Sequence, residues 1–113
     1  MKAVLGNAWV MLIIAGALEV VWASMFKFAF RANHPITAAT VVAMVASFWF
    51  LSLAMRSIPV GTAYAVWTGI GAAGAAIVGV ALYREPATAV RILSIAAIIG
   101  GVVGLKLGSG PGH

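Results

Sequence analysis

Four long apolar runs, separated by short polar connections, make up nearly all of the 113 residues of this chain. Each run is close to the length of roughly 20 residues that an α-helix needs to cross the hydrocarbon core of a bilayer. Proline and charged residues interrupt the runs, and such residues are typical of helix ends. The sequence therefore predicts an all-α integral membrane protein with four transmembrane helices, at about 8–30, 36–55, 60–83 and 88–107.

Composition excludes most other classes of protein. Hydrophobic residues make up 64% of the chain and charged residues 8%, and the mean hydropathy is +1.12, so a soluble globular domain is excluded. We expect one transmembrane domain over residues 1–107 and a flexible tail over 108–113. With no cysteine and two histidines, the chain offers no metal site, and we expect no cofactor. No nucleophile and base pair indicates an enzyme.

The basic residues favour a membrane partner over nucleic acid, although the net charge is +5. They lie singly or in pairs between the apolar runs, as lipid-interface anchors do. Four spans would place Lys2, Arg56 and Lys106 on one side and Lys27, Arg31, Arg84 and Arg91 on the other. This near balance predicts dual topology, in which copies insert both ways up. The alternative is that other charges, lipids or the insertion machinery fix one orientation.

Glu19 is the only carboxylate within the apolar runs. An ionisable group at membrane depth is costly and is usually functional, so we expect Glu19 to handle ions or protons. The structural alternative is a permanently protonated carboxyl that holds helices together. If protons and a cation compete for the same carboxylate, the competition alone produces antiport.

Aromatic and hydroxyl side chains recur at helical spacing around this carboxylate. Trp22 shares the helix face of Glu19, Tyr64 and Trp67 lie one turn apart in the third span, and Ser47 is mid-span in the second. Together they could line a pocket in which rings hold a cation and hydroxyls orient the carboxylate. Two alternatives stay open: the aromatic residues belong to an interfacial belt, or the Ser47 hydroxyl bonds to the carbonyl one turn earlier in its own helix.

Glycines are frequent in the third and fourth spans. Gly69 and Gly71 are poor helix formers in mid-span and predict a bend or flexible point, with close helix packing as the alternative. Gly100 and Gly104 lie four residues apart and suit a contact between copies, although packing within one copy is an alternative.

The chain resembles the small multidrug resistance transporters, and more closely their guanidinium exporter branch. The resemblance covers about residues 9–107 and is carried mainly by the run PVGTAYAVWTGIG at 59–71, with EVVW at 19–22 and SFW at 47–49. Trp22 is the telling position, because multidrug members usually have a smaller residue there and commonly an aromatic residue where this chain has Met44.

The resemblance implies a four-helix protomer that works as an antiparallel homodimer in the inner membrane of a bacterium. By position, it implies a proton and substrate site at Glu19, Trp22, Ser47, Tyr64 and Trp67. It also implies a helix bend at Gly69 to Gly71 and a dimer contact that includes Gly100 and Gly104. The expected function is export of guanidinium and small guanidinyl cations in exchange for protons.

Two other functions remain open from the sequence. The first keeps the mechanism but widens the substrate to quaternary ammonium or aromatic cations, as in the multidrug branch. The second is a helper subunit that transports nothing, in which Glu19 only pairs with a partner helix. A transport assay with the purified protein separates all three.

Overall fold

The computed structural model describes residues 7–29 and 34–109. These residues form α2 (Ala8–Ala29), α3 (His34–Ala54), α4 (Val60–Leu82) and α5 (Ala89–Ser109). All four helices are long and apolar enough to cross a membrane, which confirms the predicted all-helical class with four candidate spans. The helix ends lie within about two residues of the expected spans. Helix α5 continues to Ser109, so it includes two residues of the predicted tail, and residues 110–113 lie outside the described part.

Short polar side chains define two of the helix starts. The Asn7 Oδ1 accepts hydrogen bonds from the backbone N–H groups of Trp9 at 3.0 Å and Val10 at 3.3 Å. The Thr88 Oγ1 accepts one from the Arg91 N–H at 3.2 Å. Each satisfies a backbone donor that has no partner within its own helix. The helix entries are therefore set by local sequence.

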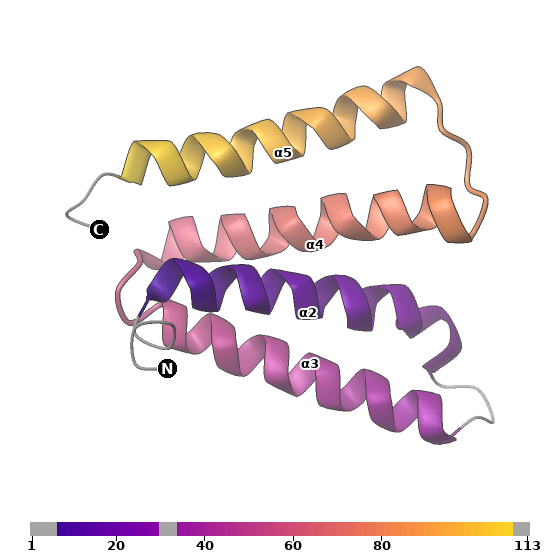
Figure 1. The fold of residues 1–113 in the computed structure, drawn as a ribbon, viewed down its shortest axis with the longest axis horizontal. Coiled ribbons are helices and arrows are strands. Elements are labelled where there is room, and N and C mark those ends of the chain that lie inside the picture. Colours follow the sequence, from indigo (N-terminus) through magenta and orange to yellow (C-terminus); the bar gives the residue numbers. More distant parts are fainter. Residues whose placement is uncertain (1–6, 30–33, 110–113) are drawn as a thin grey trace.

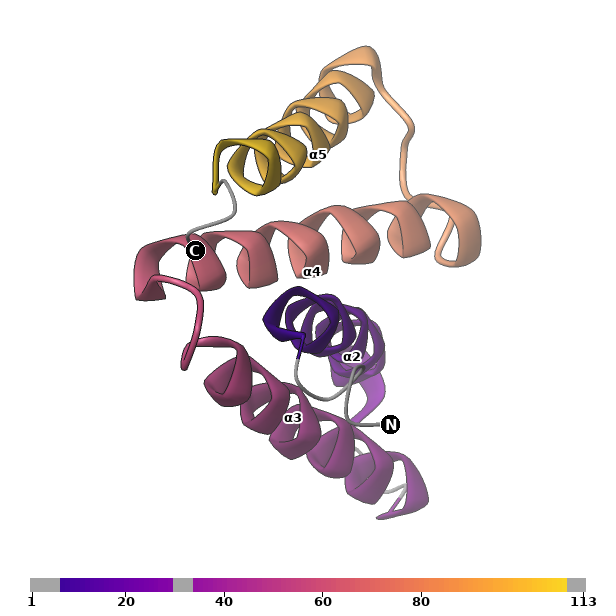
Figure 2. The ribbon, with the colours of Figure 1, turned by 60° about the vertical axis from the view of Figure 1, so that its left-hand side comes forward.

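The helices run alternately in opposite directions, so α2 begins and α5 ends at the same end of the molecule (Figure 1). Helix α2 packs against both α3 and α4, whereas α5 packs against α4 (Figure 2). Among the described residues, 28% of the most apolar stretch of α4 is buried, whereas only 6% of the corresponding stretch of α5 is buried. Three helices thus form the body of the molecule, and α5 lies along its side.

The buried apolar side chains gather where α2, α3 and α4 meet. The cluster includes Met11, Leu12, Ala15, Leu51, Ala54, Ile58, Ala63, Val66 and Trp67. Because lipid tails are as apolar as these side chains, close van der Waals packing rather than escape from water stabilises such contacts. The cluster holds α2 against α4 in the half of the bundle that contains the start of α2. Its last member on α2, Ala15, lies one turn before Glu19.

Candidate functional site

Glu19 lies at the contact between α2 and α4 and is half-buried. Its carboxyl group lies so close to Gly71 that a Cβ atom at position 71 would overlap it. Gly71 itself is buried. The absence of a side chain at this position of α4 therefore provides the space for the carboxylate.

Ser47 of α3 is fully buried and connects its own helix to α2 and α4. Its hydroxyl donates a hydrogen bond to the Ala15 carbonyl of α2 at 2.7 Å. The same oxygen accepts one from the Trp67 indole N–H of α4 at 3.0 Å. The structure thus favours the interhelical role of Ser47 over a bond within its own helix, and it fixes the Trp67 ring between α3 and α4.

Four aromatic rings from three helices form a continuous series beside this hydroxyl. Tyr64 and Trp67 have ring centroids 5.6 Å apart, Trp67 and Phe48 are 5.5 Å apart, and Phe48 and Trp22 are 6.3 Å apart. All three pairs are tilted, and their spacing is within the range of favourable aromatic contacts. The predicted residues Trp22, Tyr64 and Trp67 therefore belong to one cluster of rings.

Phe48 is the member of this cluster that sequence reasoning missed. It links Trp22 to Trp67, although nearly half of its surface is exposed. A signal was available, because Phe48 directly follows Ser47 and lies four residues after Met44, where the helix brings side chains onto one face. What the sequence could not supply was the neighbouring helix that carries its ring partners.

Two polar atoms of the site have no hydrogen-bond partner among the described residues, although they are buried. They are the Glu19 Oε1 and the Trp22 indole nitrogen. Buried polar groups usually have a partner, so such atoms call for an explanation such as a ligand, ion or water. An acceptor and a donor one helical turn apart could bind a polar guest, and the rings nearby could contact its faces.

The remaining predicted positions are glycines, and they differ in their surroundings. Helix α4 runs without a break from Val60 to Leu82 through Gly69 and Gly71, so the predicted bend stays a prediction. Gly69 lies against the Val102 side chain of α5. Gly100 and Gly104 have open space around them in the protomer, which leaves them accessible to another molecule.

Fold and site together define a small four-span membrane protein with one carboxylate inside its helix bundle. A sequence model of the Small Multidrug Resistance protein family matches residues 7–98, so the chain belongs to this family of transporters and is not an enzyme.

Three relatives from bacteria carry the same name. The guanidinium exporter of Yersinia pseudotuberculosis is 53% identical over 104 residues, which cover 90% of this chain and 99% of the relative. That of Salmonella typhimurium is 52% identical over 105 residues, covering 88% and 96%. That of Escherichia coli K12 is 53% identical over 102 residues, with the same coverage. The similarity thus extends over almost the full length of each relative.

Proposed function

We propose that this chain exports guanidinium and small guanidinyl cations in exchange for protons, with both competing for Glu19. Support for the substrate comes from the full-length similarity to three proteins named guanidinium exporter. Support for the site comes from one observation above all. A buried carboxylate oxygen lies between helices, one turn from an indole N–H, and neither has a hydrogen-bond partner in the part of the chain that the structure describes.

The substrate's chemistry matches these groups. Guanidinium is planar, stays protonated at physiological pH and presents N–H groups in forks that fit a carboxylate. Its flat faces stack on indole and phenol rings, which Trp22, Trp67 and Tyr64 supply. The Ser47 hydroxyl already holds the Trp67 indole in place. The ring would therefore be pre-organised before the cation arrives, which lowers the entropy cost of binding.

Competition at one carboxylate explains the coupling. When Glu19 is ionised it binds the cation, and when it accepts a proton it loses the charge that holds the cation. Alternating access then carries the cation one way and protons the other. The assembly in this proposal is an antiparallel homodimer in the bacterial inner membrane, with one Glu19 from each copy, and the open faces of Gly100 and Gly104 suit the contact.

The decisive experiment measures guanidinium flux into vesicles of purified protein against an imposed pH gradient. We expect Glu19→Gln to abolish the exchange, since the amide keeps the size of the side chain but cannot ionise. Glu85→Gln is the matched control, because Glu85 is the other carboxylate, lies outside the helices and pairs with Arg91 at 2.6 Å. Coupled exchange by Glu19→Gln would contradict the mechanism.

The same vesicles separate the alternative substrates. Quaternary ammonium and aromatic cations are supplied in place of guanidinium under the same gradient. We expect guanidinium to be transported faster, because a bulky cation must displace rings that pack 5.5 to 6.3 Å apart at their centroids. Equal or faster transport of the bulky cations would assign the chain to multidrug export. Absence of any flux would favour a helper subunit.

A further inference from the structure

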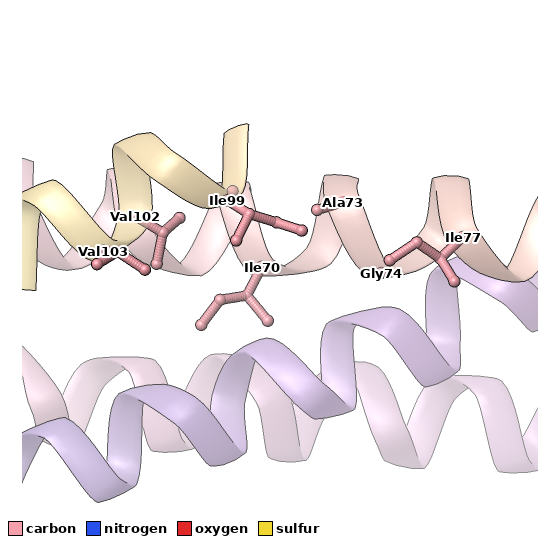
Figure 3. Close-up of a pocket in the computed structure, with 8 residues that line it drawn as sticks. Ile70, Ala73, Gly74, Ile77, Ile99, Val102 and Val103 are labelled. Atoms are coloured by element: carbon pink, nitrogen blue, oxygen red, sulfur yellow. The ribbon is translucent and has the colours of Figure 1, made fainter. Parts of the chain in front are cut away.

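An apolar groove runs along the side of α4 between α5 and α2. It consists of two adjoining hollows of about 220 Å³ each, which share Ile70, Val102 and Val103. One hollow is completed by Gly69, Ala73, Gly74, Ile77 and Ile99 (Figure 3). The other is completed by Trp9, Ile13, Val66, Lys106 and Leu107. Among the described residues, Lys106 is therefore the only charged one in the lining.

The groove follows the middle of α4 and extends along α5 to its last turn. On α4 the lining extends from Val66 to Ile77, which is about 16 Å of helix. Half of a hydrocarbon core of roughly 30 Å is about 15 Å. The stretch from Val66 to Ile77 is the middle of α4, which runs from Val60 to Leu82, whereas Lys106 lies in the last turn of α5. An acyl chain of one leaflet that enters beside Lys106 therefore occupies the part of the groove near Trp9 and ends before Ile77.

The charged end of the groove lies at the level where lipid head groups are expected. Lys106 is in the last turn of α5, and its Nζ lies 4.9 Å from the centre of the Trp9 ring near the start of α2. Tryptophan and lysine side chains favour the interface between hydrocarbon and water. Neither carboxylate side chain of the chain is paired with Lys106, since Glu85 pairs with Arg91 and Glu19 contacts Gly71.

We infer that this groove binds one anionic phospholipid, with an acyl chain along α4 and the phosphate head group at Lys106. The Trp9 ring supports the head-group end, and the apolar side chains of α4 and α5 contact the chain. A cation beside an apolar groove is complementary to an anionic lipid and less so to a zwitterionic one. This inference does not depend on which cation the protein transports.

Helical spacing places one side of the groove next to the α5 glycines and the other side away from them. Ile99, Val102 and Lys106 follow at intervals of three and four residues and share the face that lines the groove. Gly100 and Gly104 have open space around them and lie about half a turn from Val102, but Gly100 lies only about 20° from Leu107, which also lines the groove. A second copy packed on the glycines would therefore border the groove at Leu107 and leave its Val102 side open.

The test measures which lipids the full chain retains. Protein is reconstituted in vesicles of phosphatidylcholine with a minority of phosphatidylglycerol, extracted in mild detergent, and its bound lipids are quantified by mass spectrometry. We expect the parent to retain phosphatidylglycerol in preference. Lys106→Gln should reduce that preference about fivefold, the contribution of one cation near an anionic surface, and Lys106→Arg should preserve it.

Two further variants make the result specific. Arg56→Gln removes an exposed cation outside the groove lining at the α3–α4 connection, and we expect it to retain the parent's preference. Val103→Trp fills the part that both hollows share and should reduce retention of either lipid. Unchanged preference in Lys106→Gln, or unchanged retention in Val103→Trp, would overturn the inference. Because the chain has no cysteine, efficient disulfide cross-linking of Val103→Cys copies would also overturn it, by assigning the groove to a second copy.

Discussion

Helices α4 and α5 are both rich in glycine, yet the two sets of glycines have different surroundings. A Cβ atom on Gly71 would overlap the Glu19 carboxyl, and one on Gly74 would overlap the Val20 side chain. A Cβ atom on Gly100 or Gly104 would meet nothing within 4 Å. The same residue type thus provides close contact inside the protomer on α4 and an open surface on α5.

This difference shows why a small-residue stripe alone does not identify its partner. On both helices the glycines permit close approach of another helix. At Gly71 and Gly74 of α4 the approaching helix is α2, which carries the carboxylate. On α5 no described residue lies within 4 Å of a Cβ atom at Gly100 or Gly104, and only 6% of the most apolar stretch of this helix is buried. Substitutions should therefore affect the site through α4 and assembly through α5.

Among the variants that test this difference between α4 and α5, the largest effect is expected for Gly71→Ala. The added methyl group would occupy the space of the Glu19 carboxyl, which must then rotate away from its present position. A displacement of about 1 Å at a reacting group can cost up to about 100-fold in rate, so we expect guanidinium exchange to fall by about 10- to 100-fold. The measurement is initial flux in vesicles under a fixed pH gradient.

Two controls separate displacement of the carboxylate from damage to the helix. Gly61→Ala is in the same helix but meets nothing within 4 Å, so it should leave flux close to the parent value. Thermal unfolding of Gly71→Ala should change little, because the overlapping atoms are at the flexible end of a side chain. A shorter side chain in Glu19→Asp should make the Gly71→Ala loss smaller. If Gly71→Ala lowers guanidinium flux equally in the parent and in Glu19→Asp, the result would favour a role of Gly71 in bending the helix.

Most of the fold could be predicted from the sequence, because apolar length is a local property. The four runs predicted four helices, and helix ends follow from side chains such as Asn7 and Thr88, which bond to the backbone within three residues. The packing of the helices could not be predicted in this way. That α2 contacts both α3 and α4 while α5 contacts α4 depends on which faces fit together, and apolar faces in a membrane are not marked by polarity.

The sequence singles out candidate residues for the site, but it does not give their arrangement. Glu19 was singled out because a charge in an apolar run is rare. The partners of Ser47 were ambiguous from spacing, since its hydroxyl could reach a carbonyl in its own helix. The observed bond to the Ala15 carbonyl requires the register between α2 and α3. The contacts of Phe48 with Trp22 and Trp67 also depend on how the helices pack, so the sequence alone did not identify Phe48 as a member of the cluster.

An intermediate effect is expected for Gly104→Leu on α5. The added side chain has open space in the protomer, so it should leave the folding of a single copy unchanged. In a contact between copies it would be overpacked, at a cost of about 1–3 kcal/mol. We expect the dimer to dissociate at about tenfold higher concentration, measured by dilution of fluorescently labelled copies in vesicles.

Ala39→Leu tests whether any enlargement of an exposed surface has this effect. Ala39 is exposed on α3, and the substitution adds the same kind of bulk away from the glycines of α5. We expect copies of Ala39→Leu to dissociate at the same concentration as copies of the parent. If Gly104→Leu behaves like Ala39→Leu, the open glycines of α5 are not the contact between copies, and the contrast with α4 loses its functional meaning.

The smallest effect is expected at the far end of α4, where Tyr83 connects this helix to α2. Its hydroxyl donates a hydrogen bond to the Ser24 carbonyl at 2.5 Å, whereas the connection between α5 and α2 is the contact of Lys106 with the Trp9 ring. Interhelical hydrogen bonds in membranes average about 0.6 kcal/mol, so Tyr83→Phe should lower the unfolding free energy by about that amount. Tyr64→Phe removes a hydroxyl that bonds to none of the described residues, and it should leave the unfolding free energy unchanged. Equal losses in the two variants, measured by unfolding in mixed micelles, would mean that α4 is held to α2 by packing at its glycines alone.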